Sequence, residues 1–171
     1  MLVITLGIAA YVSHQPSLAQ QRFNTTAIEL TSTDAFRDAP KNWKIVGDLK
    51  GGPDDKAPMP SKGTGILFND YSDKVKYKSD ANLFTKLEHS DVLLELDFMM
   101  PKGSNSGIYF QGRYEIQLYD SWKTTDLHSF DCGSIYDRWD DSRPQGQQGF
   151  EGHPPRVNAS RRTTSGPPAT A

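Results

Sequence analysis

Residues 105–119 read NSGIYFQGRYEIQLY and contain two strand-like runs, 107–111 and 114–119. The runs are joined around Gly112 and Arg113. A short connection that contains glycine between two such runs is typical of a β-hairpin. The stretch therefore predicts two antiparallel strands, and the alternation of its side chains predicts that one face of the pair turns toward a core.

Further strands are predicted on the N-terminal side of this hairpin. Strand-like pieces lie at 43–46, 65–68 and 83–87, separated by glycine, proline and polar residues. The stretch 51–63, GGPDDKAPMPSKG, has the composition of a surface loop.

The stretch 92–98, VLLELDF, alternates apolar residues with Glu95 and Asp97. This pattern predicts a half-buried antiparallel strand whose apolar face contacts the core. No segment shows the sustained spacing of an amphipathic helix. The expected fold class is therefore all-β, a jelly-roll β-sandwich of antiparallel strands.

Length and charge restrict the class of protein. The chain has 171 residues, enough for one domain with a core, and a formal net charge of -2. It lacks the basic runs of a nucleic-acid binder, so no nucleic acid is expected as a partner. The single cysteine, Cys132, excludes a disulfide within the chain and a cysteine-based metal cluster.

The N-terminal run MLVITLGIAAYV has about the length of the apolar region of a signal peptide. Ser17 and Ala19 supply small residues before a cleavage site, although no Lys or Arg precedes Arg22. We expect 1–19 to be a signal peptide, with a secreted or periplasmic protein and no membrane span after its removal. The alternative interpretation of this run is a buried N-terminal strand.

The rest of the chain divides into three parts. Residues 20–40 form a polar lead-in, 41–160 hold the predicted sandwich, and 161–171, RRTTSGPPATA, have the composition of a disordered tail.

The second strand of the hairpin carries the candidate site. Period-two geometry places Arg113, Glu115 and Gln117 on one face, with alternate positions roughly 7 Å apart. The apolar side chains between them face the core. Aromatic residues are dense nearby, and sugar sites combine aromatic surfaces with polar side chains. A solvated sheet face remains the alternative interpretation.

Several familiar sites are not supported. Glu115 and Asp120 are an odd number of residues apart and roughly 16 Å apart on an extended strand, so they do not form the carboxylate pair of an ordinary glycosidase. Motifs for a P-loop, a dinucleotide or a histidine-rich zinc site are absent. No cofactor is predicted; a divalent cation held by such carboxylates stays an open alternative that no spacing demonstrates.

Three segments carry a resemblance to a known family: LLELDFMMPKGSNSGIYFQGRYEIQLYDS, DCGSIYDRW and FEGHPPRVNAS. Through them, residues 43–160 resemble the 3-keto-disaccharide hydrolase family. The resemblance implies a concanavalin-like jelly roll that acts on glycosides whose sugar was oxidised at C3 by a separate oxidoreductase. Since the family pattern stops at Ser160, we expect a truncated chain and a sandwich that is incomplete at its C-terminus.

A ketone at C3 acidifies the proton on C2, so one base can start elimination of the group on C1, after which water adds back. The resemblance and the strand geometry together assign the candidate roles. Glu115 is the expected base, Arg113 and Gln117 contact the substrate or its enolate, and Asp97 is a second acid. Supporting substrate contacts are expected from Asn105, Tyr109, Asp120 and Trp122.

Two other function classes fit the same fold. A carbohydrate-binding jelly roll needs aromatic surfaces and hydrogen bonds but no activated base, and fold alone does not choose between the two. An interaction domain would use Trp122 and Trp139 as anchors for another protein.

Overall fold

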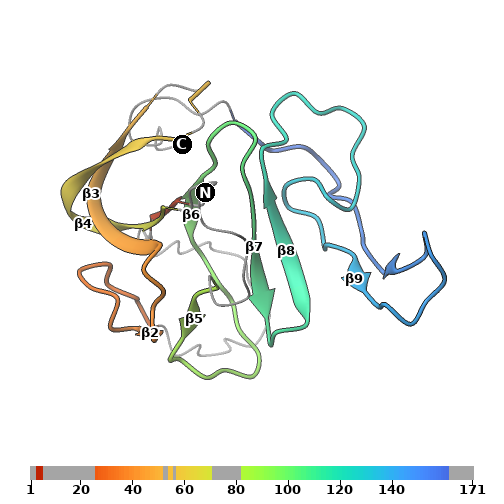
Figure 1. Ribbon diagram of the computed structural model, residues 1–171, viewed down its shortest axis with the longest axis horizontal. Helices are drawn as coiled ribbons and strands as arrows, with labels where there is room; N and C mark the ends of the chain where they lie inside the picture. The colour runs from red at the N-terminus through yellow and green to blue at the C-terminus, as the bar shows by residue number, and fades with distance from the viewer. Residues whose placement is uncertain (1–2, 6–25, 52–53, 56, 71–81, 162–171) are drawn as a thin grey trace, which may run out of the picture.

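The computed structural model describes residues 3–5, 26–51, 54–55, 57–70 and 82–161 (Figure 1). These residues form antiparallel strands and no helix, which confirms the all-β class predicted from the sequence. The strands are β1 Val3–Thr5, β2 Phe36–Arg37, β3 Trp43–Lys50, β4 Met59–Asn69, β5 Phe84–Thr85, β6 Asp97–Met99, β7 Asn105–Phe110, β8 Tyr114–Tyr119, β9 Arg138–Trp139 and β10 Gly149–Phe150.

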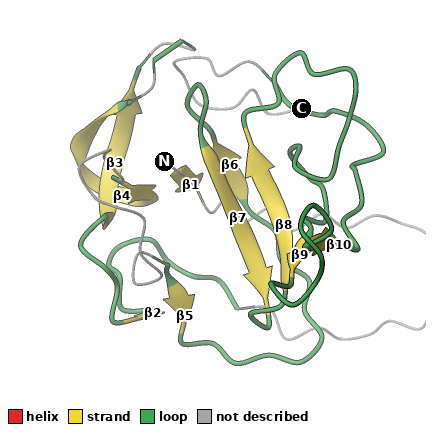
Figure 2. Ribbon diagram, turned by 45° about the vertical axis from the view of Figure 1, so that its right-hand side comes forward, coloured by secondary structure: helices red, strands yellow, loops and turns green. Residues whose placement is uncertain are grey.

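The largest sheet has four strands in the order β3-β4-β1-β6, and smaller pairs are β2–β5, β7–β8 and β9–β10. Figures 1 and 2 show β7 and β8 between the long β3–β4 hairpin and the short β9–β10 pair. The hairpin predicted within 105–119 is therefore present as β7 and β8.

The long β3–β4 hairpin corrects the loop predicted at 51–63. Met59 to Gly63 belong to β4, because this part of the chain pairs with the second half of β3 after a register shift between Val46 and Asp48. At the shift the two backbones come so close that a Cβ on Gly47 would lie 2.8 Å from the Cα of Gly63. Proline and glycine occur in irregular strand pairing as they do in loops, so the composition did not distinguish the two.

The strand predicted at 92–98 is wrong over most of its length. Only its end enters β6, which pairs with β1, while Val92, Leu93 and Leu94 are exposed. Within the described residues no strand pairs with 92–96. An alternating pattern shows which face would be buried, but a strand also needs a hydrogen-bonding neighbour and a layer that covers its apolar face.

The N-terminal strand β1 lies between β4 and β6 and pairs with both. This position matches the alternative interpretation of the N-terminal run, as a strand. The predicted cleavage site at Ser17 to Ala19 lies outside the described residues, so the signal peptide stays a prediction. In the described part of the chain, no helix has the length and apolar character needed to cross a membrane.

The core joins the large sheet to the β7–β8 pair. Leu118 of β8 and Met100 form one buried cluster, against which Trp43 of β3 and Ile108 of β7 pack. Trp43 also contacts a second cluster, which is built from Leu30, Phe36 and Leu67. Part of the predicted polar lead-in, 26–40, therefore contributes apolar side chains to the core. Because these contacts lie on one side of β8, its other face is left to form a site.

Phe68 on β4 provides a test of this packing. Its side chain is 1% exposed and packs with Val46, so Phe68→Ala should lower the free energy of unfolding by about 3–5 kcal/mol. Met59 on the same strand is 70% exposed, and Met59→Ala should change the free energy of unfolding by less than about 0.5 kcal/mol. Urea denaturation measures the free energy of unfolding of both variants. Equal losses in Phe68→Ala and Met59→Ala would contradict the buried position of Phe68.

Candidate functional site

The register of β7 and β8 decides which side chains share a face. Tyr109 pairs with Glu115, and Gly107 pairs with Gln117. These residues lie on the face away from Leu118, which is in the core. The structure therefore places Glu115 on the face that the alternation of the sequence predicts.

The side chain of Glu115 lies across Gly107. A Cβ built on Gly107 would come within 2.6 Å of the Glu115 Cδ, so the space that the carboxyl occupies exists only because residue 107 is glycine. The phenol of Tyr109 donates a hydrogen bond to this carboxyl group. A half-buried carboxyl with a fixed position and one hydrogen-bond donor is well arranged to act as a base.

Burial raises the pKa of the Glu115 carboxyl above its usual value, because the charged form loses hydration. The hydrogen bond from Tyr109 acts in the opposite direction and is the smaller effect. A raised pKa makes the carboxylate a stronger base. Perturbed acids of this kind are frequent at functional sites.

A third segment pairs with the edge of β8 that does not face β7, and it supplies the second wall of the site. The Tyr136 N–H donates to the carbonyl of Glu115 at 2.9 Å, and the Gln117 N–H donates to the carbonyl of Ser134 at 3.0 Å. Ile135 continues the pairing to His153 on its other side. The chain after Ser134 is thus held beside Glu115 and leads into β9.

The β7–β8 hairpin forms the first wall and the segment 136–139 the second, and between them lies an open pocket of about 370 Å³. This volume falls within the roughly 300–1,000 Å³ of small-molecule sites. The lining combines two arginines, two carboxylates and three aromatic rings with one glycine: Tyr109, Gly112, Arg113, Glu115, Tyr136, Asp137, Arg138 and Trp139. Carbohydrate recognition uses the same combination of charged hydrogen-bonding groups and aromatic faces.

Asp137 is the second carboxylate of the pocket and is held by two donors. Its Oδ2 accepts from the Ser129 hydroxyl at 3.0 Å, and its Oδ1 accepts from the Gly152 N–H at 3.0 Å. These bonds tie the pocket wall to two neighbouring loops. Unlike Glu115, Asp137 already uses both oxygens to bind the protein.

Three of the candidate residues from the sequence line the pocket: Arg113, Glu115 and Tyr109. The structure does not bring Gln117 there, because its side chain is 2% exposed and its Nε2 donates to the carbonyl of Phe130 at 3.3 Å. The loop that covers Gln117 follows β8 in the sequence, so strand periodicity alone does not reveal it.

Four other candidates also lie outside the pocket lining. Asp120 accepts a hydrogen bond from the Gly103 N–H at 2.8 Å and so caps the turn before β7. Asn105 stands at the start of β7, opposite Tyr119. The two remaining residues are Asp97 on β6 and the exposed Trp122.

Sequence reasoning did not select residues 136–139 as substrate contacts. All four residues lie in the segment DCGSIYDRW, one of the three that carry the family resemblance, and that was the sequence signal which could have pointed to them. Nothing in that segment indicates its position beside β8, which depends on backbone hydrogen bonds to Glu115 and Gln117. Within the described residues, no three His, Cys, Asp or Glu side chains come close enough together to hold a metal ion.

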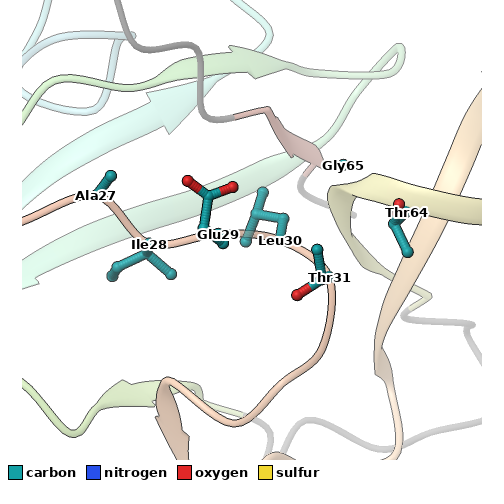
Figure 3. A pocket seen from close by; sticks show the side chains of 7 residues that line it. All are labelled: Ala27, Ile28, Glu29, Leu30, Thr31, Thr64 and Gly65. Atoms are coloured by element: carbon teal, nitrogen blue, oxygen red, sulfur yellow. The ribbon is translucent and has the colours of Figure 1, made fainter.

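A second hollow, of about 210 Å³, is lined by residues 27–31 with Thr64 and Gly65 (Figure 3). Glu29 is the one ionisable residue in this lining, and none of the candidate residues from the sequence contributes to it. The arrangement does not provide the base and the cation that the expected chemistry needs. The pocket around Glu115 is therefore the candidate site.

The hydrogen bond between Tyr109 and Glu115 predicts a shift that can be measured. The phenol stabilises the charged carboxylate, so Tyr109→Phe should raise the pKa of Glu115 further. Tyr114→Phe, which removes a hydroxyl from the opposite face of β8, should leave this pKa unchanged. NMR titration of the labelled Glu115 carboxyl carbon measures both, and an unchanged or lower pKa in Tyr109→Phe would disprove the contact.

Comparison with known proteins finds a family match over most of the chain. Residues 31–165 match the family described as the 3-keto-alpha-glucoside-1,2-lyase-like domain. No curated protein and no solved structure matches the chain. The match covers every strand from β2 to β10, and the concanavalin-like jelly roll of the family agrees with the antiparallel all-β structure. The chain therefore belongs to the 3-keto-disaccharide hydrolase family, a group of hydrolase- or lyase-like domains.

Proposed function

We propose that this protein cleaves 3-keto-glycosides, including 3-keto-disaccharides, and that Glu115 is the catalytic base. The observation that carries the proposal is the position of Glu115: a half-buried carboxyl over Gly107, in a pocket with arginines and aromatic rings. Membership of the family supports the substrate class.

The first step is removal of the C2 proton by the Glu115 carboxylate. The electron pair of the C–H bond moves into an enolate, whose negative charge lies on the C3 oxygen. Arg113 is the cation proposed to stabilise this oxygen. Arg138 is engaged with Glu151 at 3.1 Å, whereas no ion pair of Arg113 is found among the described residues.

In the second step the enolate re-forms the C3 ketone, a C1–C2 double bond forms, and the bond from C1 to the leaving oxygen breaks. The leaving oxygen takes a proton from the Glu115 carboxylic acid or from water. Water then adds across the double bond, with oxygen at C1 and hydrogen at C2, so that the net reaction is hydrolysis. If water does not add, the reaction ends as a 1,2-elimination, which is the lyase activity that the family description names.

The proposed substrate requires an earlier oxidation of the sugar at C3 by a separate oxidoreductase. We also propose that the protein is exported, on the basis of the apolar run at its N-terminus. Cleavage after Ala19 would remove β1 from the sheet, and N-terminal sequencing of the expressed protein would detect that cleavage.

A carbohydrate-binding module is the second candidate function, because the pocket lining contains three aromatic rings. A binding module would bind the oxidised disaccharide and its unoxidised parent without cleaving either. The enzyme should cleave the oxidised sugar alone, because the parent has no acidified proton at C2.

Glu115→Gln should reduce kcat for a 3-keto-disaccharide by about a hundredfold to ten-thousandfold, since an amide cannot accept the proton. KM and the melting temperature should change little, because glutamine keeps the size of the side chain. Glu95→Gln removes an exposed carboxylate outside the pocket and should keep full activity. Near-normal turnover in Glu115→Gln would exclude this residue as the base.

Isotope incorporation separates elimination from direct hydrolysis. In D2O, elimination followed by hydration should place one deuterium at C2 of the released 3-keto-sugar, whereas direct cleavage at C1 leaves hydrogen there. Mass spectrometry and proton NMR at early times measure the label. The released sugar incubated alone and with Glu115→Gln corrects for spontaneous exchange, and product without excess deuterium would contradict elimination.

A further inference from the structure

Trp139 is the most exposed of the aromatic side chains that line the pocket. Its side chain is 68% exposed, compared with 57% for Tyr109 and 37% for Tyr136. A large apolar ring in water gains nothing from the hydrophobic effect until something covers it. An exposed indole that also belongs to a pocket wall therefore indicates a ligand with an apolar face.

The indole of Trp139 is held at its edge, while most of the residue is exposed. Its Nε1 donates to Asp141 Oδ1 at 2.8 Å, which orients the ring. Trp139 pairs with Gly149 across β9 and β10, so the neighbouring position on the same face carries no side chain. The ring is thus oriented before any ligand arrives, and binding needs little further loss of conformational entropy.

The β9–β10 pair that carries Trp139 is braced by charged side chains. Arg138 binds Glu151 at 3.1 Å, and its guanidinium lies 5.4 Å from the centre of the Phe150 ring. The guanidinium of Arg143 lies 4.2 Å from the same ring. These cation–π contacts stabilise the short hairpin and keep Trp139 in place beside the pocket.

The pocket has one closed end and one open end. Next to Glu115 on β8, toward the end of the strand, Gln117 is buried and donates a hydrogen bond to the carbonyl of Phe130. In the other direction the chain after Tyr136 runs antiparallel to β8, toward the tip of the β7–β8 hairpin. Trp139 lies three residues beyond Tyr136, roughly 10 Å along an extended chain. A substrate that extends past Glu115 therefore extends toward Trp139.

We propose that Trp139 is a specificity residue that stacks against the leaving group of the substrate. The inference depends on the proposed function, which puts the oxidised ring at Glu115 and leaves the group on C1 to extend along the open end of the pocket. A second sugar ring or an aromatic aglycone presents a flat apolar face to the indole, and a methyl group does not. The protein therefore prefers 3-keto-glycosides with a cyclic leaving group.

The test compares Trp139→Ala and Trp139→Phe with the wild-type chain on two substrates, a 3-keto-disaccharide and methyl 3-keto-glucoside. In Trp139→Ala, the ratio of kcat/KM for the disaccharide to that for the methyl glycoside should fall by about tenfold, or ~1.4 kcal/mol. Trp139→Phe keeps an aromatic face and should lose less. Tyr114→Ala removes an exposed aromatic ring outside the pocket lining and should leave the ratio unchanged.

A binding measurement keeps this inference separate from the proposed function. The unoxidised parent disaccharide should quench indole fluorescence in the wild-type chain and in Glu115→Gln, and the quenching should disappear in Trp139→Phe. If the wild-type chain cleaves neither substrate but this quenching pattern holds, the catalytic proposal fails and the stacking site stands. If both substrates are cleaved while the ratio and the quenching survive Trp139→Phe and Trp139→Ala, the stacking site is excluded and the enzyme proposal stands.

Discussion

The antiparallel pairing of β7 with β8 is the constraint on which the site depends. Leu118 and Ile108 on one face pack with Met100 and Trp43, so the hairpin is held against the large sheet. Since side chains alternate along a strand, this anchoring turns Glu115 to the opposite face, beside Tyr109. A register shift by one residue would bury the carboxyl in the core and expose the leucine.

The pocket also needs a wall that the hairpin does not contain. The Tyr136 N–H donates to the Glu115 carbonyl and the Ser134 carbonyl accepts from the Gln117 N–H, so a third segment extends the pair along the edge of β8 that does not face β7. Asp137 then fastens this segment to Ser129 and Gly152 through its two oxygens. Burial raises the pKa of the Glu115 carboxyl, and residues of this second wall line the same pocket. Site chemistry and tertiary packing therefore depend on the same few contacts.

The sequence predicted the hairpin well because its evidence is local. Glycine at the connection and alternation along 114–119 reflect turn geometry and period-two burial, which act over a few residues. Prediction failed at 92–96 for a physical reason of another kind. The apolar alternation is real, yet a strand forms only when a neighbour pairs with it, and these residues have no such neighbour in the described part of the chain.

The amino-acid sequence by itself determined that Glu115 and Leu118 occupy opposite faces of their strand, and it supplied a glycine at 107, which has no Cβ; the pairing of β7 with β8 then laid the Glu115 carboxyl across that glycine. The opposite faces follow from backbone periodicity alone. The tertiary structure alone decided that Gln117 is covered and that Trp139 reaches the pocket. Those outcomes depend on where the chain after β8 returns, through contacts between residues far apart in the sequence, and no short-range pattern encodes that path.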